Sequence, residues 1–147
     1  MKDIYFDLIS NLGEALKVRQ IRNDNRQYFT NDTKYINLFR QIWWYFTYYK
    51  KGEYKVYISR NTERQVIGYG AILVKNRIGY ITECVDKRYH GQGFGEAILI
   101  NLMQIANREH LLLIAEVLDT NVRSKKLHEK LGFVLHEKTE RTTRYAY

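Results

Sequence analysis

Hydrophobic positions in the first third of the chain follow mainly a helical period. A short alternating stretch at residues 4–9 predicts a strand, and residues 12–23 change to helical spacing. Residues 23–33 are polar and rich in Asn and Asp, which predicts a loop or a short irregular helix. Residues 34–49 predict a strong helix with one apolar stripe, which we expect to face the core. This stripe consists of Tyr35, Leu38, Phe39, Ile42, Phe46 and Tyr49.

The middle of the chain has the two-residue period of β-strands. It begins after Gly52, a residue type that commonly ends a helix. Three strands are predicted over residues 54–60, 65–74 and 77–85, and the short polar turns between them favour antiparallel hairpins.

The last third alternates between helices and strands. Helices are predicted over residues 93–109 and 122–131, and residues 133–147 alternate like a terminal hairpin. The apolar run at residues 111–117 predicts a strand that is covered on both faces. Because a helix connects this run to the strand that ends at Val85, the usual handedness of such crossovers makes the two strands parallel.

Together these elements predict one α+β domain over residues 1–147, with a mixed, mostly antiparallel sheet that gains one parallel pair at its middle. A ligand is expected at that pair. The chain is long enough to form a core without disulfides or a structural metal. Cys84 is the only cysteine, and with a charged N-terminus and no signal peptide it favours a reducing, cytoplasmic location.

Charge and hydropathy narrow the possible partners only partly. No apolar run approaches the roughly 20 residues that span a bilayer, so a membrane role is not expected. The formal net charge of +8 permits binding to nucleic acid, to a membrane surface or to a polyanionic small ligand. The basic residues are scattered along the chain, so charge does not choose among these.

The segment at residues 81–106 combines an apolar strand, a glycine-rich turn and a helix. Gly91, Gly93 and Gly95 lack a Cβ and so let the backbone approach a ligand closely. The N–H groups at the start of the helix have no intrahelical partners, and the positive end of the helix dipole favours phosphate at the same point. The sequence therefore predicts a nucleotide-like or diphosphate-bearing ligand.

Two motifs resemble those of the GCN5-related N-acetyltransferases. The turn His90-Gly91-Gln92-Gly93-Phe94-Gly95 is similar to the acetyl-coenzyme A signature of that family, in which Arg or Gln, two variable residues, Gly, one variable residue and Gly or Ala cradle the pyrophosphate. The stretch AEVLDTNVRSKKLHEKLGF, residues 115–133, is similar to a second family motif that runs from a strand ending in Glu-Val through an Asn to a helix ending in Leu-Gly-Phe.

The resemblance implies a GNAT-like sheet of six to seven strands, about four flanking helices and a central parallel pair that splays apart. Acetyl-CoA is the implied co-substrate, and no metal is implied. The family binds the pantetheine arm through an Asn and through the main chain of the splayed strand. The residues expected to bind the coenzyme are Cys84, Val85, His90, Gly91, Gln92, Gly93, Phe94, Gly95, Glu96, Asn121 and Lys125.

Three of these residues have a further interpretation. Asn121 is also explained locally as a helix N-cap. His90 departs from the Arg or Gln of the family, although most of the cradle is backbone. Strand alternation turns the Cys84 thiol away from the Glu83 face, which predicts a packed core thiol and not a nucleophile.

Acetylation of an amine requires a base, because an alkyl ammonium with a pKa of about 10 is mostly protonated at neutral pH. Glu116 interrupts the apolar run, and it resembles the base of the N-terminal amino-group acetyltransferases. Glu83 is the rival, because other branches take a base from its strand. For both glutamates the alternative is a solvated or ion-paired carboxylate at a strand end.

A second catalytic group is needed to protonate the departing thiolate. His128 stands where many family members have a tyrosine that is assigned as the general acid. The ordinary pKa of histidine, about 6.5, suits proton exchange at neutral pH. The alternative is an exposed helix histidine without a catalytic role.

The expected acceptor is the primary amine of a small molecule, acetylated directly in a ternary complex. The segment VRQIRNDNRQYFTND resembles family members that acetylate nucleotide-linked amino sugars, and this suggests Asn23, Tyr28 and Trp44 as substrate-binding residues. Trp44, Tyr45 and Tyr48 lie off the predicted core stripe, where they would line an acceptor pocket or a homodimer contact.

Two other functions stay open at this point. One is an N-acetyltransferase that acts on protein N-termini, polyamines or aminoglycosides. The other is a non-catalytic module that binds CoA, or that binds nucleic acid through its aromatic helix and basic surface. Nucleic acid is not the expected partner of the enzyme.

Overall fold

The computed structural model describes residues 1–30 and 33–147. These residues contain seven strands and four α-helices, joined by turns and loops. The strands are β1 (Tyr5–Leu8), β2 (Tyr54–Arg60), β3 (Val66–Lys75), β4 (Ile78–Val85), β5 (Leu112–Leu118), β6 (Val134–Lys138) and β7 (Thr142–Ala146). The helices are α1 (Leu12–Asp24), α2 (Leu38–Thr47), α3 (Phe94–Glu109) and α4 (Val122–Lys130).

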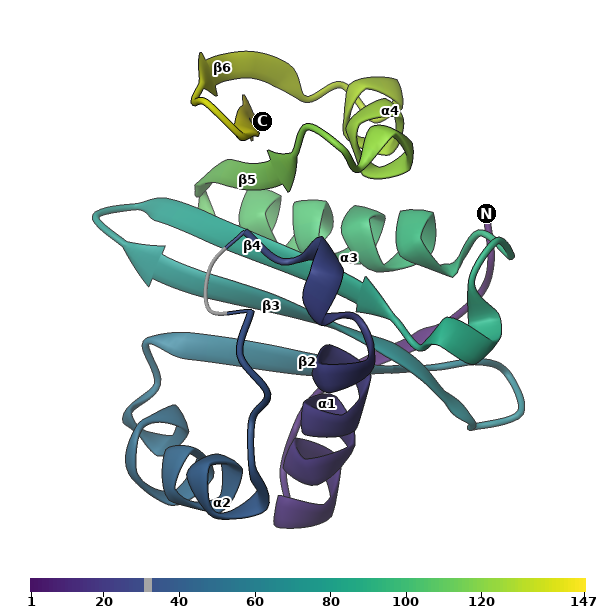
Figure 1. Ribbon diagram of the computed structural model, residues 1–147, viewed down its shortest axis with the longest axis vertical. Helices are drawn as coiled ribbons and strands as arrows, with labels where there is room; N and C mark the ends of the chain where they lie inside the picture. The colour runs from purple at the N-terminus through teal and green to yellow at the C-terminus, as the bar shows by residue number, and fades with distance from the viewer. Residues whose placement is uncertain (31–32) are drawn as a thin grey trace.

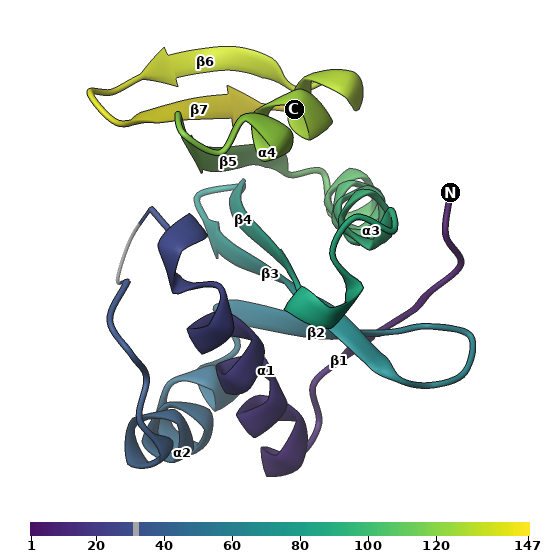
Figure 2. The same ribbon diagram turned by 45° about the vertical axis from the view of Figure 1, so that its right-hand side comes forward.

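The strands form one mixed sheet in the order β1-β2-β3-β4-β5-β7-β6 (Figure 1). β4 and β5 run parallel, and all other neighbours run antiparallel. Helices α1 and α2 lie on one side of the sheet and α3 lies on the other (Figure 2). The predicted α+β fold with a central parallel pair is therefore confirmed.

Each face of the sheet has its own hydrophobic core, because side chains along a strand point alternately to opposite faces. The core beside α1 and α2 includes Ile21, Tyr69 and Cys84. The core beside α3 includes Ile81 and Leu102, and Leu127 of α4 packs against it. β4 contributes side chains to both cores. An opening beside β4 can therefore be lined by residues from both sides of the sheet.

Asparagine caps decide where the first two helices begin. Asn11 Oδ1 accepts a hydrogen bond from Glu14 N at 2.9 Å at the start of α1. Asn37 Oδ1 accepts one from Arg40 N at 2.8 Å, so α2 begins at Leu38 and not at the predicted residue 34. The predicted loop before α2 contains a short 3-10 turn at Arg26–Tyr28, and its residues 31 and 32 lie outside the described residues.

The buried face of α2 differs from the predicted one. Phe39 is 80% exposed and Phe46 is 53% exposed, whereas Tyr45 is only 6% exposed. Gln41 is also buried, and its Nε2 donates to Ala15 O at 2.7 Å. The predicted core stripe is therefore wrong. Helix α2 is apolar on most of its sides, so spacing alone could not choose the side that packs on α1.

The terminal hairpin forms as predicted, and its position in the sheet matters for the site. β7 lies between β5 and β6, so it pairs with both strands. Its register places Arg144 directly opposite Glu116 of β5. The C-terminal strand thus supplies a cation to a residue that the sequence predicts to be catalytic.

Candidate active site

β4 and β5 are paired for only part of their length. Their parallel register runs from Ile78 opposite Leu112 to Ile81 opposite Ala115. Beyond this point β4 stays bonded to β3 as far as Val85, whereas β5 follows β7. The strands separate toward their carboxyl ends, and a cavity of about 1210 Å³ lies at the opening.

The glycine turn forms one end of this cavity. Gly91 and Gly93 have φ angles of 77° and 88°, a left-handed conformation that favours glycine. Gly93 is the N-cap of α3 and offers no side-chain oxygen, and Ala97 N donates to Gly93 O at 3.4 Å. The N–H groups of residues 94–96 come before that bond and point out of the helix N-terminus. Such an arrangement binds phosphate.

Two cationic side chains lie beside the glycine turn. Lys2 Nζ lies 5.5 Å from the centroid of the Phe94 ring. Arg123, in the first turn of α4, is close enough that a Cβ added to Gly91 would lie 3.4 Å from its Nη2. The surroundings of the turn are therefore suited to an anion.

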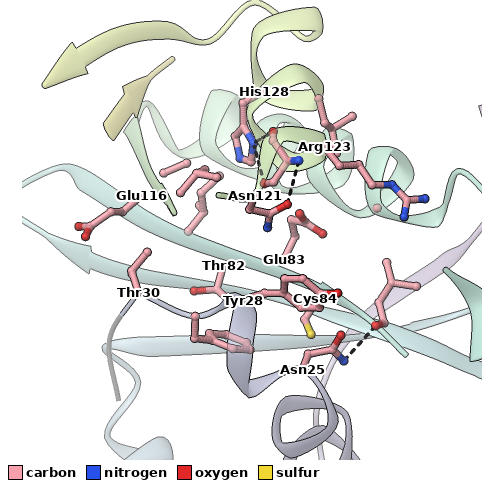
Figure 3. Close-up of a pocket in the computed structure, with 18 of the residues that line it drawn as sticks. Asn25, Tyr28, Thr30, Thr82, Glu83, Cys84, Glu116, Asn121, Arg123 and His128 are labelled. Atoms are coloured by element: carbon pink, nitrogen blue, oxygen red, sulfur yellow. Dashed lines mark hydrogen bonds between the residues drawn. The ribbon is translucent and has the colours of Figure 1, made fainter. Parts of the chain in front are cut away.

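Glu83 lies on the α3 side of β4, next to the first turn of α3. A Cβ added to Gly95 would lie 3.4 Å from Glu83 Oε2. The carboxyl group is directed toward Asn121 and Arg123 (Figure 3). Burial raises the pKa of Glu83 to about 7, and Arg123 counteracts part of this shift. The carboxyl group is thus partly protonated at neutral pH.

Glu116 lies on the other side of the opening, with its carboxylate directed away from Glu83 (Figure 3). Arg144 Nε donates to Glu116 Oε2 at 3.0 Å, and Arg144 Nη1 donates to Glu137 Oε2 at 2.9 Å. Because Glu116 lines the cavity, the interruption of the apolar run places an ion-paired carboxylate at the opening.

His128 is buried between aromatic rings and is 3% exposed. Its ring stacks on Tyr145 with centroids 5.8 Å apart and meets the edge of Phe133 at 5.0 Å. Nδ1 lies 2.8 Å from Ser124 O, which can only accept, so Nδ1 is protonated. Burial lowers the pKa of His128, although the bond to Ser124 opposes this, and the ring is mainly neutral at pH 7.

Polar side chains secure the end of β4 and the start of α4. Val85 O accepts hydrogen bonds from Asn25 Nδ2 at 3.2 Å and from His90 Nε2 at 2.9 Å. The histidine that replaces the Arg or Gln of the family thus ties the glycine turn to β4. Asn121 Oδ1 accepts from Ser124 N at 3.2 Å, which confirms the predicted N-cap of α4.

Cys84 faces the layer of α1 and is 6% exposed. Burial raises the pKa of its thiol, which therefore stays protonated at neutral pH. The interpretation of Cys84 as a packed core thiol is confirmed.

Most of the predicted site residues line the cavity. They are Tyr28, Glu83, Cys84, Val85, His90, Gly91, Gly93, Phe94, Gly95, Glu96, Glu116, Asn121 and His128. Gln92 is exposed within the glycine turn and is not part of the lining.

Three other predicted residues are not brought to this cavity. Lys125 Nζ bonds Asp119 Oδ1 at 3.3 Å. Asn23 holds the backbone of Ile36 through bonds of 3.0 and 2.8 Å. Trp44 lines a separate cavity of about 300 Å³ between α1 and α2. Lys125 belongs to the second motif, but its side chain turns to Asp119, whereas Asn23 and Trp44 belong to α1 and α2.

Two arginines of the cavity were missed in the sequence. Arg144 pairs with Glu116 only because β7 lies beside β5, and no sequence pattern reveals that neighbourhood. Arg123 follows Asn121 by two residues at the start of a helix, and this position could have indicated a side chain near the ligand.

The cavity fits a coenzyme with a diphosphate and an extended, amide-containing arm. The backbone donors of the glycine turn suit the diphosphate. Beyond Ile81 and Ala115 the facing edges of β4 and β5 are not paired with each other, so they can offer backbone groups to the arm. Acetyl-CoA bound in this way would supply an acetyl thioester. In the described parts of the chain, no cluster of side chains could hold a metal ion, and no helix is long and apolar enough to cross a membrane.

Comparisons with known sequences agree with this geometry. A model of the acetyltransferase (GNAT) family matches residues 17–133. A curated relative, the glucosamine 6-phosphate N-acetyltransferase of Trypanosoma brucei brucei, is 28% identical over 95 residues, which are 59% of this chain and 63% of the relative. The chain therefore spans less than two thirds of the length of that relative.

Solved structures share the whole fold at low sequence identity. The spermidine N-acetyltransferase from Vibrio cholerae, in complex with CoA and spermine, has a TM-score of 0.85 at 15% identity, over 98% of this chain and 94% of that one. The yncA protein from Salmonella typhimurium, with its cofactor acetyl-CoA, has a TM-score of 0.77 at 18% identity, over 98% and 92%. The chain belongs to the acetyltransferase (GNAT) family.

Proposed function

We propose that this protein transfers the acetyl group of acetyl-CoA directly to the primary amine of a phosphate-bearing amino sugar, in a ternary complex. Membership of the acetyltransferase family supports the reaction. The curated relative named for glucosamine 6-phosphate supports the acceptor class, which also includes nucleotide-linked amino sugars. A cytoplasmic location and a homodimer stay predictions.

The charge of the cavity wall is the observation that supports this acceptor. Among the described lining residues there are three carboxylates, and two of them are paired: Glu96 with Lys130 and Glu116 with Arg144, each at 3.0 Å. The third, Glu83, lies beside the glycine turn. A polyamine would need several unpaired carboxylates along its length, whereas a sugar needs neutral polar groups. Neutral polar residues of the lining include Asn25, Gln27, Tyr28, Thr30, Tyr80 and Thr82.

Glu116 is the proposed base. Glu83 lies against the first turn of α3, where the diphosphate is expected, and the pantetheine arm separates the diphosphate from the thioester. We therefore expect Glu83 to act on the coenzyme and not as the base for the amine. Glu116, oriented by Arg144, removes a proton from the ammonium directly or through water, and the neutral amine then attacks the thioester carbonyl. Backbone N–H groups at the free edge of the opening can donate to the carbonyl oxygen.

His128 is the proposed proton donor to the departing thiolate, a role that requires its charged form. Burial lowers the pKa of His128, so only a small fraction of the ring is charged at pH 8. This charged fraction grows as the pH falls from about 8 to about 6. The ratio of wild-type kcat to His128→Gln kcat should therefore increase over this range in an assay of thiol release. If the two proteins bound CoA equally well and their kcat values changed with pH in parallel, His128 would not be the proton donor.

A panel of amines tests the proposed function. Thiol release from acetyl-CoA is measured with glucosamine 6-phosphate, a UDP-linked amino sugar, glucosamine, spermidine and a peptide. We expect kcat/KM for a phosphate-bearing sugar to exceed that for glucosamine at least about tenfold, because one charge-assisted contact to phosphate is worth about 1.4 kcal/mol or more.

Other outcomes of the panel would contradict the proposal. A preference for spermidine or for the peptide would reject the acceptor class. CoA binding without turnover of any amine would indicate a non-catalytic module, and salt-sensitive oligonucleotide binding without CoA binding would indicate a nucleic-acid-binding protein.

A further inference from the structure

The Arg123 guanidinium lies at the glycine turn, and the Glu83 carboxyl group is directed toward it (Figure 3). A Cβ added to Gly91 would lie 3.4 Å from Arg123 Nη2. Arg123 is exposed and belongs to the first turn of α4. Its guanidinium can therefore change direction without disturbing either core.

The Glu83 carboxylate and a bound diphosphate would share one positive region. Glu83 Oε2 lies next to Gly95 in the first turn of α3, where the helix dipole stabilises an anion. A diphosphate at the glycine turn would place further negative charge beside Glu83 and would also attract Arg123. Both effects disfavour the ionised form of Glu83.

Arg123 is the main electrostatic partner of Glu83 among the described residues; Lys126 of α4 also lines the cavity but is not among the charges that shift the pKa of Glu83. On α3, Glu96 is paired with Lys130 at 3.0 Å. On α4, the His128 ring is mainly neutral because burial lowers its pKa. On β3, the residue opposite Glu83 is Gly70. Arg123 is the one side chain whose charge has a resolved effect on the pKa of Glu83.

We propose that Arg123, whose guanidinium already lies at the glycine turn, is a coenzyme-binding residue whose charge offsets that of Glu83 in the free protein and that of the diphosphate when the coenzyme binds, while Glu83 takes up a proton from solvent. This proposal rests on the proposed function. It assigns Glu83 the role of a counter-charge for Arg123, separate from that of the base.

Proton uptake distinguishes this exchange from a purely structural role of Glu83. The free protein has a Glu83 pKa of about 7, and binding raises it further, so uptake is largest at a pH slightly above 7. Calorimetric titration of the full chain with CoA is performed at about pH 7.5 in buffers of different ionisation enthalpy. Wild type should take up about half a proton more than Glu83→Gln. Because both proteins bind the same CoA, the difference between them removes any proton uptake by the phosphates of CoA.

Affinity measurements provide the second readout. The affinity of wild type for CoA should fall as the pH rises above 7, whereas Glu83→Gln should keep a flatter profile and bind severalfold more tightly than wild type at about pH 8.5. Arg123→Gln should weaken CoA binding about tenfold and should lose the extra proton uptake. Arg108→Gln removes the same charge from the last turn of α3, at the far end of that helix, and should change neither quantity.

The outcomes separate the two proposals. Absence of CoA binding by folded wild type overturns the proposed function and this inference with it. CoA binding with equal proton uptake by wild type and Glu83→Gln overturns the inference alone, as does an equal loss of affinity in Arg123→Gln and Arg108→Gln.

Discussion

Gly93→Ala should weaken CoA binding at least tenfold, a loss of about 1.4 kcal/mol. Gly93 has a φ of 88°, and an L-residue held in this left-handed region costs about 1–2 kcal/mol. The nearest protein atom to an added Cβ would be Lys2 Cγ at 3.6 Å, an ordinary contact. The added methyl group therefore does not clash with the protein. The strained φ angle would instead shift the backbone N–H groups that face the diphosphate, and the methyl group would reduce the space for the ligand.

Gly52→Ala is the matched control for backbone strain. Gly52 has a φ of 85°, nothing lies within 4 Å of a Cβ added to it, and it ends the segment after α2. Both variants should lose about 3–6 °C in Tm, and only Gly93→Ala should lose affinity in calorimetric titrations with CoA. Equal CoA affinities for the two variants would show that the glycine turn does not hold the diphosphate.

Glu116→Gln should lower kcat about 100-fold or more without changing the affinity for CoA. The amide oxygen can still accept the hydrogen bond from Arg144, so the geometry is kept while the basic group is lost. General-base catalysis contributes typically about 10²- to 10⁴-fold. The deficit should shrink as the pH rises toward the pKa of the acceptor amine, because solution then supplies the neutral amine.

Glu137→Gln is the control for the ion pair alone. Glu137 accepts from the other side of Arg144 and is exposed, so its loss should change kcat less than about twofold. Steady-state rates of thiol release across pH measure both variants. If Glu116→Gln behaved like Glu137→Gln, then Glu116 would be an ion-paired carboxylate without a catalytic role, and the base would have to be sought elsewhere in the cavity.

The order of the elements was predictable because local periodicity survives folding. β2 matches its predicted bounds, and α3 and α4 match theirs to within one residue at each end. The parallel pairing of β4 and β5 also followed from the sequence, since a helix between two neighbouring strands is the usual connection of a parallel pair. The glycine turn was predictable for a similar reason, because Gly91 and Gly93 adopt angles that other residues rarely adopt.

Side-chain neighbours were not predictable in the same way. The sequence placed Lys125 with the coenzyme, but the structure pairs it with Asp119. The periodicity of α2 was correct as a helix signal and wrong as a burial signal, since Phe39 is exposed and Gln41 is buried. In each case the outcome depends on which element packs against the helix, and spacing along one segment contains no information about that.

The sequence by itself determined the helices and strands, the glycine turn at the start of α3, and the family to which the chain belongs. These features depend on backbone preferences and on residues that lie close together along the chain. Only the tertiary structure decided that Arg144 meets Glu116 and that Arg123 of α4 reaches the glycine turn near Glu83. These contacts join distant segments, so they arise from the packing of the whole sheet and of α4 beside it.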